Sequence, residues 1–306
     1  MIVCCGEALV DVLGGDEPVS VPGGGPMNAA IAAARLGAPS AFIGRVSTDA
    51  DGELIWKHLE RNRVDLRAAE RGPEPTARAI ISLTPSPSFR FEGTDTADTA
   101  LGSADLSPIG AGPHIVHGGT LGMFRGRTAD VLARLAERHD GIVSLDPNVR
   151  PAVISSRQRW DHFHQWWLQA TDLYRASDED IEWIWPGRSA ESCAGELLDG
   201  RAAAVIITRG AEGAAVYTAA GATDVAAPAV DIVDTVGAGD SFVGAVLASL
   251  WELLGADRAA FAALDLRQWR AIAERAAAAA AITCTRPGAD PPDDAELETV
   301  LAESLR

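Results

Sequence analysis

The sequence has almost no lysine: Lys57 is the only one, so nearly all of its 26 basic Lys and Arg side chains are arginines. A Walker A phosphate loop needs Gly-Lys followed by Ser or Thr, whereas Lys57 follows Trp56. The chain therefore has no P-loop, and Schiff-base or lysine-nucleophile chemistry has almost no candidate. Any anion site must use guanidinium groups or backbone N–H groups.

Basic residues are also outnumbered: 26 Lys and Arg against 43 Asp and Glu give a formal net charge of −17. A field of that sign repels phosphate backbones and anionic lipid surfaces, so we expect no nucleic-acid partner and no membrane partner. The longest wholly apolar run, residues 276–282, is far too short to span a bilayer. No basic leader precedes the first apolar segment, which favours a cytoplasmic protein.

Several familiar site signatures are missing as well. Residues 26–28 follow the triple glycine 23–25 and spoil the third glycine of a dinucleotide-binding loop. The sequence contains neither a G-x-S-x-G elbow nor an H-E-x-x-H helix. No C-x-x-C pair or metal-ligand spacing occurs, so buried, reduced thiols are expected at Cys4, Cys5, Cys193 and Cys284.

What is present is an alternation of short β-like runs and amphipathic helical segments. Residues 1–5 predict a first strand, residues 29–36 a helix that Gly37 ends, and residues 41–44 the next strand. The second half repeats this rhythm, with a helix beginning near Thr128. The pattern predicts an α/β fold, a mostly parallel sheet with helices on both faces.

The segment from about residue 74 to 100 has a different character. Residues 79–84 and 89–91 predict two strands around a Pro/Ser turn. With the short run 19–21 they are expected to form a small antiparallel sheet, separate from the main one. Local pattern alone leaves two interpretations open, a lid or an ordinary edge hairpin.

Polar residues collect just after three predicted strands. Residues 142–145 end in Asp146-Pro147-Asn148-Val149-Arg150, and residues 204–207 end in Thr208-Arg209-Gly210. The run 230–233, taken as a third strand, ends in Asp234-Thr235-Val236-Gly237. Ligands of open α/β sheets bind at the carboxyl ends of strands, so these three clusters are expected to face one crevice.

The most informative stretch is Gly237-Ala238-Gly239-Asp240, which precedes a strong helical pattern. Backbone N–H groups of small residues at a helix N-terminus can converge on an anion, and the helix dipole assists them. Asp240 beside such a cradle can accept the proton of a hydroxyl that attacks a terminal phosphoryl group. The alternative is that Asp240 simply caps the helix.

Residues 234–242, Asp-Thr-Val-Gly-Ala-Gly-Asp-Ser-Phe, resemble the carboxyl-side signature of the ribokinase-like (phosphofructokinase B) family of small-molecule kinases. Residues 23–30 and Leu36-Gly37 resemble its amino-side signature. Segments 6–11, 146–151 and 208–213 are also similar to family segments, in the same order. The likeness covers nearly the whole chain.

This resemblance implies an ATP-dependent sugar kinase in which residues 1–306 form one Rossmann-like domain. A small β lid, inserted from about 12–22 and 74–100, is often shared between subunits of a homodimer in this family. By position in the motifs, Asp240 would be the general base, and Gly237, Ala238 and Gly239 the anion hole. The positions that would bind the sugar hydroxyls are Asp11, Gly24, Gly25 and Asn28.

The nucleotide is expected to rest on backbone N–H groups and on Thr208, Gly210 and Gly213. Arg150, placed after a strand in a chain almost without lysine, is the candidate for contacting a transferred phosphate or an anionic part of the substrate. Arg209 lies beside the nucleotide loop and is a weaker candidate.

The chain departs from the family where many relatives have Asn-x-x-Glu, a segment tied to Mg²⁺ and phosphate placement. Here Ser177 and Asp180 occupy those positions, which keeps the polarity but shortens the reach. Mg²⁺ can be bound through waters, so the change is tolerable. Some relatives also bind a monovalent cation such as K⁺, which Asp234, the Val236 carbonyl and the Gly288 loop are candidates to hold.

The form of residues 146–151 is more similar to the fructokinase and 2-keto-3-deoxygluconate kinase branch than to ribokinase or adenosine kinase. Fructose is the first choice of substrate, with 2-keto-3-deoxygluconate, ribose or a nucleoside as alternatives. A catalytically silent sugar-binding protein is the rival from another class. A nucleoside hydrolase or dehydrogenase is disfavoured, because neither an acidic metal cluster nor a dinucleotide loop is visible.

Overall fold

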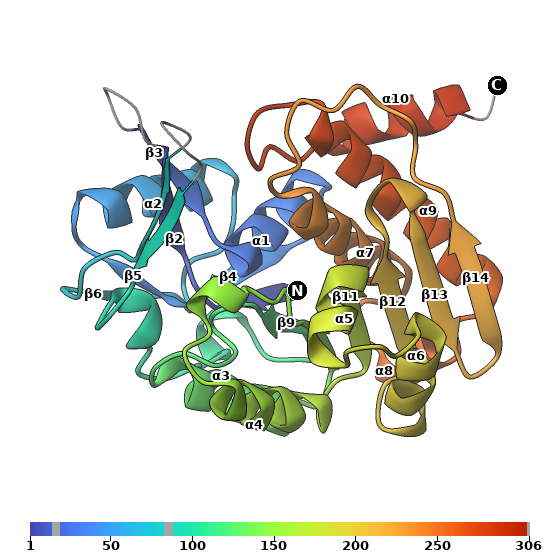
Figure 1. The fold of residues 1–306 in the computed structure, drawn as a ribbon, viewed down its shortest axis with the longest axis horizontal. Helices are drawn as coiled ribbons and strands as arrows, with labels where there is room; N and C mark the ends of the chain where they lie inside the picture. The colour runs from blue at the N-terminus through green and yellow to red at the C-terminus, as the bar shows by residue number, and fades with distance from the viewer. Residues whose placement is uncertain (14–18, 83–87, 305–306) are drawn as a thin grey trace.

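The computed structural model describes residues 1–13, 19–82 and 88–304. Its centre is an eight-stranded sheet in the order β14-β13-β12-β11-β10-β9-β1-β4 (Figure 1). The strands from β12 to β4 run parallel, while β13 pairs antiparallel with both β12 and β14. The strands are β1 (Ile2–Cys5), β4 (Ser40–Ile43), β9 (Ile115–Gly119), β10 (Ile142–Asp146), β11 (Leu173–Ser177), β12 (Ala204–Thr208), β13 (Ala214–Thr218) and β14 (Gly221–Val225).

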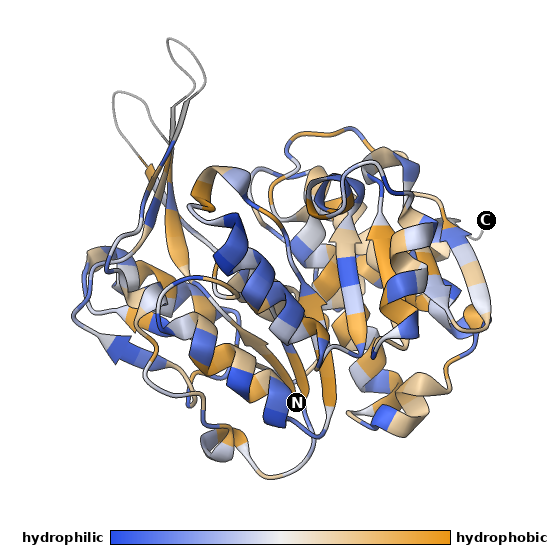
Figure 2. Ribbon diagram, turned by 60° about the horizontal axis from the view of Figure 1, so that its bottom comes forward, coloured by the Kyte–Doolittle hydropathy of each residue, from blue (hydrophilic) through white to orange (hydrophobic). Residues whose placement is uncertain are grey.

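Helices cover both faces of this sheet, as the alternating pattern predicted. The core on one face includes α1 (Gly25–Arg35), α7 (Ala238–Leu254) and α9 (Leu266–Cys284). The other face packs against α3 (Thr128–Arg138), α4 (Arg157–Leu168), α5 (Asp178–Ile184) and α6 (Ala190–Asp199). In Figure 2 the strands are mainly hydrophobic, because a parallel sheet is buried on both faces.

The remaining elements are short or lie at the periphery. They are α2 (Ala50–Arg61), α8 (Arg258–Ala262), α10 (Asp294–Ser304), the strand pair β5 (Arg45–Ser47) and β6 (Glu70–Gly72), and the 3₁₀ turns η1 (Ala97–Thr99), η2 (Ser107–Ile109), η3 (Pro151–Val153) and η4 (Gly210–Glu212). Every helix in the described part of the chain is too short or too polar to cross a bilayer.

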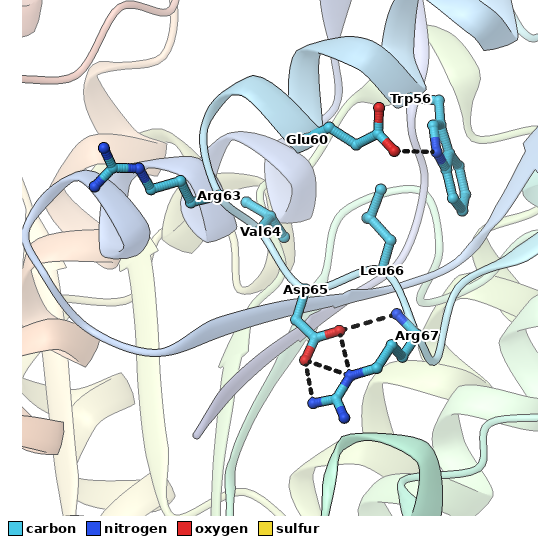
Figure 3. Close-up of a pocket in the computed structure, with 7 residues that line it drawn as sticks. All are labelled: Trp56, Glu60, Arg63, Val64, Asp65, Leu66 and Arg67. Carbon is cyan, nitrogen blue, oxygen red and sulfur yellow. Dashed lines mark hydrogen bonds and ion pairs between the residues drawn. The ribbon is translucent and has the colours of Figure 1, made fainter.

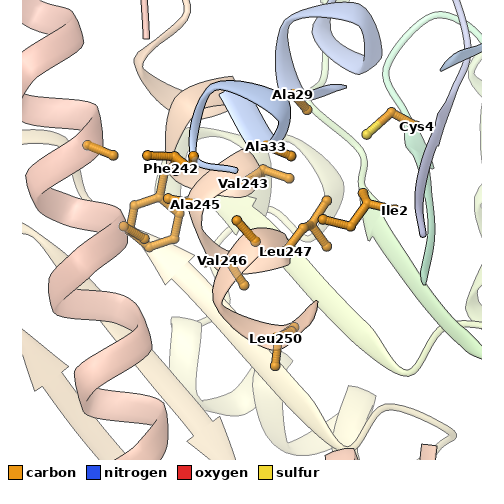
Figure 4. Packing of buried hydrophobic residues seen from close by; sticks show 14 of the residues in the cluster. Ile2, Cys4, Ala29, Ala33, Phe242, Val243, Ala245, Val246, Leu247 and Leu250 are labelled. Carbon is orange, nitrogen blue, oxygen red and sulfur yellow. The ribbon is translucent and has the colours of Figure 1, made fainter. Parts of the chain in front are cut away.

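The close approach of α1 and α7 brings the two signature segments together. A Cβ atom on Gly244 of α7 would overlap Ala32 of α1, so only glycine permits this spacing. Ala29 and Ala33 of α1 pack against buried α7 residues such as Val243 (Figure 4). This packing fixes the first turn of α1 beside the first turn of α7.

A separate four-stranded sheet has the order β3-β2-β7-β8 and lies beside α2, at the opposite end of the molecule from β14 (Figure 1). Its strands are β2 (Leu9–Leu13), β3 (Val19–Gly23), β7 (Arg78–Ser82) and β8 (Ser88–Glu92). The prediction of a small separate sheet is confirmed, but the prediction that it is antiparallel is wrong in part, because β2 and β7 pair in parallel. Residues 14–18 and 83–87 of the predicted lid lie outside the described residues.

The predicted third strand at residues 230–233 is wrong. This run forms an irregular connection from β14 to α7, in which Ile232 and Val233 are each 63% exposed. The backbone N–H of Val233 donates to the Cys284 carbonyl at 2.8 Å and not to a neighbouring strand. An apolar run forms a strand only where it lies alongside a sheet edge, and this run lies instead against the carboxyl end of α9.

The order in which strands are added to the sheet changes side at β1. β4 pairs in parallel on one side of β1, and β9 pairs in parallel on the other. The loops after neighbouring strands on either side of such a point leave a crevice at the carboxyl ends of the strands. The segments that begin there are residues 6–8 after β1, Thr120 after β9 and residues 147–150 after β10. The candidate site is therefore expected at this edge.

Candidate active site

Asp240 is in the first turn of α7, but it does not cap that helix. The N-cap is Gly237, in the left-handed conformation with φ of 76°, and no side-chain capping hydrogen bond is present. Instead, the Asn28 amide Nδ2 donates to Asp240 Oδ2 at 2.8 Å. The alternative that Asp240 serves as a helix cap is thus excluded by its hydrogen bonding, and its carboxylate is held against α1.

Gly25 forms the floor of a small notch beside this carboxylate. A Cβ atom on Gly25 would lie 2.8 Å from Thr120 Oγ1, 3.2 Å from Asn148 Nδ2 and 3.4 Å from Asp240 Oδ1. The absence of a side chain therefore leaves room for a small group among a hydroxyl, an amide and a carboxylate. This is the geometry needed to bind a hydroxyl-rich ligand close to Asp240.

Thr120 was missed by the sequence analysis, and Asn148 was noticed only as part of a motif. Both have positive φ, 48° for Thr120 and 36° for Asn148, which is rare for residues other than glycine and costs about 1–3 kcal/mol. Such strain gathers at functional sites, because neighbouring structure must enforce it. No local sequence signal indicates these dihedral angles.

Asp11, on β2 of the small sheet, faces the same region. Its pKa is raised to about 6, mainly by burial and also by the negative charge of Asp240, with Arg150 opposing both effects. A Cβ atom on Gly23 would lie 2.5 Å from Asp11 Oδ2, so glycine there leaves room for this carboxylate. Gly24, with φ of 124°, lies against the backbone of Glu7 and Ala8. The structure thus brings Asp11, Gly24, Gly25 and Asn28 to one place.

Burial also raises the pKa of Asp240, while the Asn28 hydrogen bond and the charges of Arg150 and Arg175 lower it. Arg150 is exposed, and its guanidinium Nη1 donates to the Val149 carbonyl at 3.1 Å. Its charge acts on both Asp11 and Asp240, so Arg150 lies close to these two carboxylates. A general base with a raised pKa is well matched to proton transfer near neutral pH.

The nucleotide residues expected from the sequence lie after β12. Thr208 ends that strand, and Gly210 and Gly213 flank the turn η4 with φ of 52° and 89°. A Cβ atom on Gly213 would overlap the Val225 carbonyl, so this tight turn requires glycine. Arg209 forms an ion pair with Asp224 at 2.6 Å.

Asp180 has a structural role that the sequence analysis did not foresee. It forms a capping box with Ser177 at the start of α5, and its Oδ1 accepts the Val149 N–H at 2.7 Å. Both carboxylate oxygens are therefore already hydrogen-bonded. No cluster of three or more His, Cys, Asp or Glu side chains suited to a metal occurs in residues 1–13, 19–82 and 88–304. The donor set thus fits a Mg²⁺ held mainly through phosphate oxygens and waters.

The candidate monovalent-cation residues do lie together. Asp234 accepts the Val236 N–H at 3.0 Å and the Gly288 N–H at 2.8 Å. Its carboxylate therefore ties the turn that precedes α7 to the loop that follows α9.

A hollow of about 580 Å³ beside α2 differs from this site (Figure 3). Trp56 Nε1 donates to Glu60 at 3.0 Å, and Arg67 forms an ion pair with Asp65 at 2.6 Å. Four of its polar side chains therefore pair with one another, whereas the hydroxyl, amide and carboxylate around Gly25 come from three separate segments.

Glu7, directly after β1, is a buried acid next to the site. Its Oε2 accepts the Gly122 N–H at 2.8 Å, while Oε1 has no partner among the described residues. Its pKa is raised to about 8, mainly by burial and also by the nearby charges of Asp98 and Asp240, against the lowering effect of its backbone hydrogen bonds. Glu7 thus holds the loop that contains Thr120 as a neutral acid.

We expect Glu7→Gln to flatten the pH dependence of stability. Between pH 4.5 and about 8 the folded chain holds a proton that the unfolded carboxyl has lost, so stability falls as the pH rises through this window. The slope is at most about 1.4 kcal/mol per pH unit. Urea unfolding at pH 5.5 and pH 8.5 should show a larger decline for the parent than for the variant. Parallel declines would show that Glu7 is not protonated in the folded chain.

The chain is similar over nearly its whole length to known carbohydrate kinases. A profile of the pfkB family carbohydrate kinases matches residues 2–296. The chain is 33% identical over 259 residues to a fructokinase of Rhizobium leguminosarum bv. trifolii, a match that covers 82% of this chain and 79% of that protein. A crystal structure of fructokinase with bound ATP from Xylella fastidiosa superimposes with a TM-score of 0.91 at 26% identity, over 100% of this chain and 99% of that one. A fructokinase double mutant from Vibrio cholerae O395, in a form with bound fructose, ADP and potassium ion, gives a TM-score of 0.84 at 26% identity over 97% of both chains.

Proposed function

The chain belongs to the pfkB family of carbohydrate kinases, and from this premise we propose that it is an ATP-dependent fructokinase that forms fructose 6-phosphate. The observation that carries the proposal is the Asp240 carboxylate, held by Asn28 beside the notch at Gly25 and within the first turn of α7. The fructokinases with bound ATP, or with bound fructose and ADP, share this fold at 26% identity.

In the proposed reaction, Asp240 accepts the proton of the sugar's primary hydroxyl as its oxygen attacks the γ-phosphorus of ATP. The bond between that phosphorus and the β–γ bridging oxygen breaks, and ADP leaves with the oxygen. Backbone N–H groups of Gly237, Ala238 and Gly239 stabilise the charge on the transferred oxygens. Arg150 contacts the transferred phosphate or the substrate at the mouth of the site.

Asp11, Gly24, Gly25 and Asn28 bind the sugar hydroxyls in this proposal, and the nucleotide rests on Thr208, Gly210 and Gly213. Ser177 and Asp180 would hold Mg²⁺ through waters, and the ion would neutralise charge on the phosphates. K⁺ is proposed at Asp234 and the Val236 carbonyl, supported by their proximity to the Gly288 loop and by the potassium-bound Vibrio fructokinase.

We further propose a single domain over residues 1–306, in which the small sheet is a lid over the sugar, and a cytoplasmic location. Asp11 supports the lid assignment, because it links β2 of that sheet to the site.

Pairing of two copies through the lid is proposed as the mode of dimerisation. Light scattering after size exclusion should give a homodimer mass, and a monomer mass would contradict it.

The proposal is tested with a panel of fructose, 2-keto-3-deoxygluconate, ribose and nucleosides, each with ATP and Mg²⁺, followed by ADP release. Fructose is expected to give the highest kcat/KM. Turnover of another sugar would replace fructose while keeping the kinase mechanism. Tight binding of one sugar without any phosphorylation would instead support a catalytically silent binding protein.

We expect Asn28→Ala to reduce kcat/KM for fructose by about 1–3 kcal/mol of transition-state stabilisation, or about 5- to 150-fold. The variant loses the proposed hydrogen bond to the sugar and also the bond that Asn28 donates to Asp240. Steady-state kinetics at several fructose concentrations measure the effect. Asn62→Ala is a suitable control, since Asn62 accepts from Arg35 at 2.8 Å, away from the notch. Unchanged efficiency in Asn28→Ala would remove this residue from the site.

A further inference from the structure

Arg175 is a buried arginine in the middle of β11. The other residues of this strand are apolar, aromatic or small. Its guanidinium Nη1 donates to Asp146 Oδ2 at 2.7 Å, at the end of β10. Its Nη2 donates to Thr208 Oγ1 at 2.7 Å, at the end of β12. One side chain therefore ties together the carboxyl ends of three neighbouring strands.

The same guanidinium packs against the turn that opens α7. A Cβ atom on Gly239 would lie 3.3 Å from Arg175 Nη2 and 3.4 Å from Nη1, so the charged group lies against the backbone of the proposed anion hole. Its carbon lies 5.9 Å from the centre of the Phe242 ring, one turn further into α7. Arg175 therefore contacts the anion-binding turn from the side of the sheet.

The electrostatic surroundings of Arg175 are strongly acidic. Asp146 on β10, Asp180 on α5 and Asp240 on α7 all act on its charge. His117 on β9 also faces it, and burial together with the Arg175 charge lowers the pKa of His117 to about 3, so this imidazole is neutral. A site with these carboxylates would repel the phosphates of ATP unless a fixed cation offset them, and Arg175 is the buried cation among them.

We propose that Arg175 is a positioning residue for phosphoryl transfer, one that fixes the anion-binding turn of α7 and supplies the buried positive charge behind it. This inference rests on the proposed kinase function. Arginine suits the role better than lysine, because its planar guanidinium donates to Asp146 and Thr208 at the same time and also packs against Gly239. The charge also favours the ionised form of Asp240, which the reaction requires.

The test compares Arg175→Met, Arg175→Lys and the double variant Arg175→Met/Asp146→Asn with the parent. Removing Arg175 alone leaves the buried Asp146 carboxylate unpaired and destabilises the fold, whereas the double variant removes both charges. Arg258→Met is the matched control. Arg258 pairs with the buried Asp172 at 2.8 Å, at the opposite end of the same strand.

We expect the folded double variant to show a kcat about 10²-fold below the parent and a higher KM for ATP. In the single variant Arg175→Met, Asp240 loses a neighbouring cation while Asp146 keeps its charge, so the acid limb of kcat/KM should move to higher pH. Arg175→Lys should keep the acid limb near its parental position, and Arg258→Met should lower the melting temperature with parental kcat. A double variant that is folded, with parental kcat and a parental KM for ATP, would overturn the proposal. A parent without kinase activity would overturn the proposed function instead, and it is recognised before any variant is compared.

Discussion

Replacing Asp240 with Asn is expected to lower kcat for fructose phosphorylation by at least about 10² to 10⁴. Asn is nearly isosteric, and its amide oxygen can still accept the hydrogen bond that Asn28 donates. It has no basic oxygen to accept the hydroxyl proton. ATP binding should persist, because the backbone N–H groups of the α7 turn are unchanged.

The matched control for this variant is Asp130→Asn. Asp130 occupies the third position of α3, as Asp240 does in α7, and both are acidic residues in a first helical turn. The two variants lose the same favourable interaction with a helix dipole, which contributes about 0.3–1 kcal/mol. Only Asp240→Asn should lose turnover. Near-parental kcat in Asp240→Asn, with Asp130→Asn equally active, would exclude Asp240 as the general base.

On acidification, the activity of the parent enzyme should begin to fall at a higher pH than it would if Asp240 had the ordinary pKa of an aspartate. Burial raises the pKa of Asp240, so on acidification the carboxylate takes up a proton earlier and ceases to act as a base. The acid limb of kcat/KM reports this ionisation in the free enzyme. Asp11, with a pKa raised to about 6, interacts with the charge of Asp240, so the limb reflects both groups.

The parts of the site that the sequence predicted are those encoded within one short segment. The turn from Gly237 to Asp240 needs small residues and positive φ, and these requirements are visible in the residue types themselves. The α/β class was likewise predicted from periodicity, because buried parallel strands and amphipathic helices differ in their spacing of apolar residues.

What the sequence did not predict depends on contacts between distant segments. Arg175 is one arginine among many until β10 and β12 place Asp146 and Thr208 on either side of it. The strained Thr120 and the parallel pairing of β2 with β7 have no local signal either. The irregular course of residues 230–233 has no local signal for the same reason, since it depends on their hydrogen bond to Cys284 at the end of α9.

Gly237→Ala is expected to lower kcat by about 10² to 10³, the loss typical of a displaced donor in an anion hole. A Cβ atom at this position would overlap Ala289, in the loop that Asp234 ties to the turn through Gly288. The turn must therefore move, and its N–H groups no longer converge on the transferred phosphoryl group.

Gly187→Ala separates this displacement from simple backbone strain. Gly187 has φ of 74°, nearly the same as the 76° of Gly237, but a Cβ atom there meets nothing within 4 Å. Both variants force alanine into the left-handed region, so both should lose about 1–2 kcal/mol of stability. Thermal unfolding should show a loss in both variants, larger in Gly237→Ala because of the added clash with Ala289. Kinetics with fructose and ATP should show a large loss only in Gly237→Ala. Equal kcat values in the two variants would mean that the α7 turn does not bind the phosphoryl group, since the strain is common to both and the clash is not.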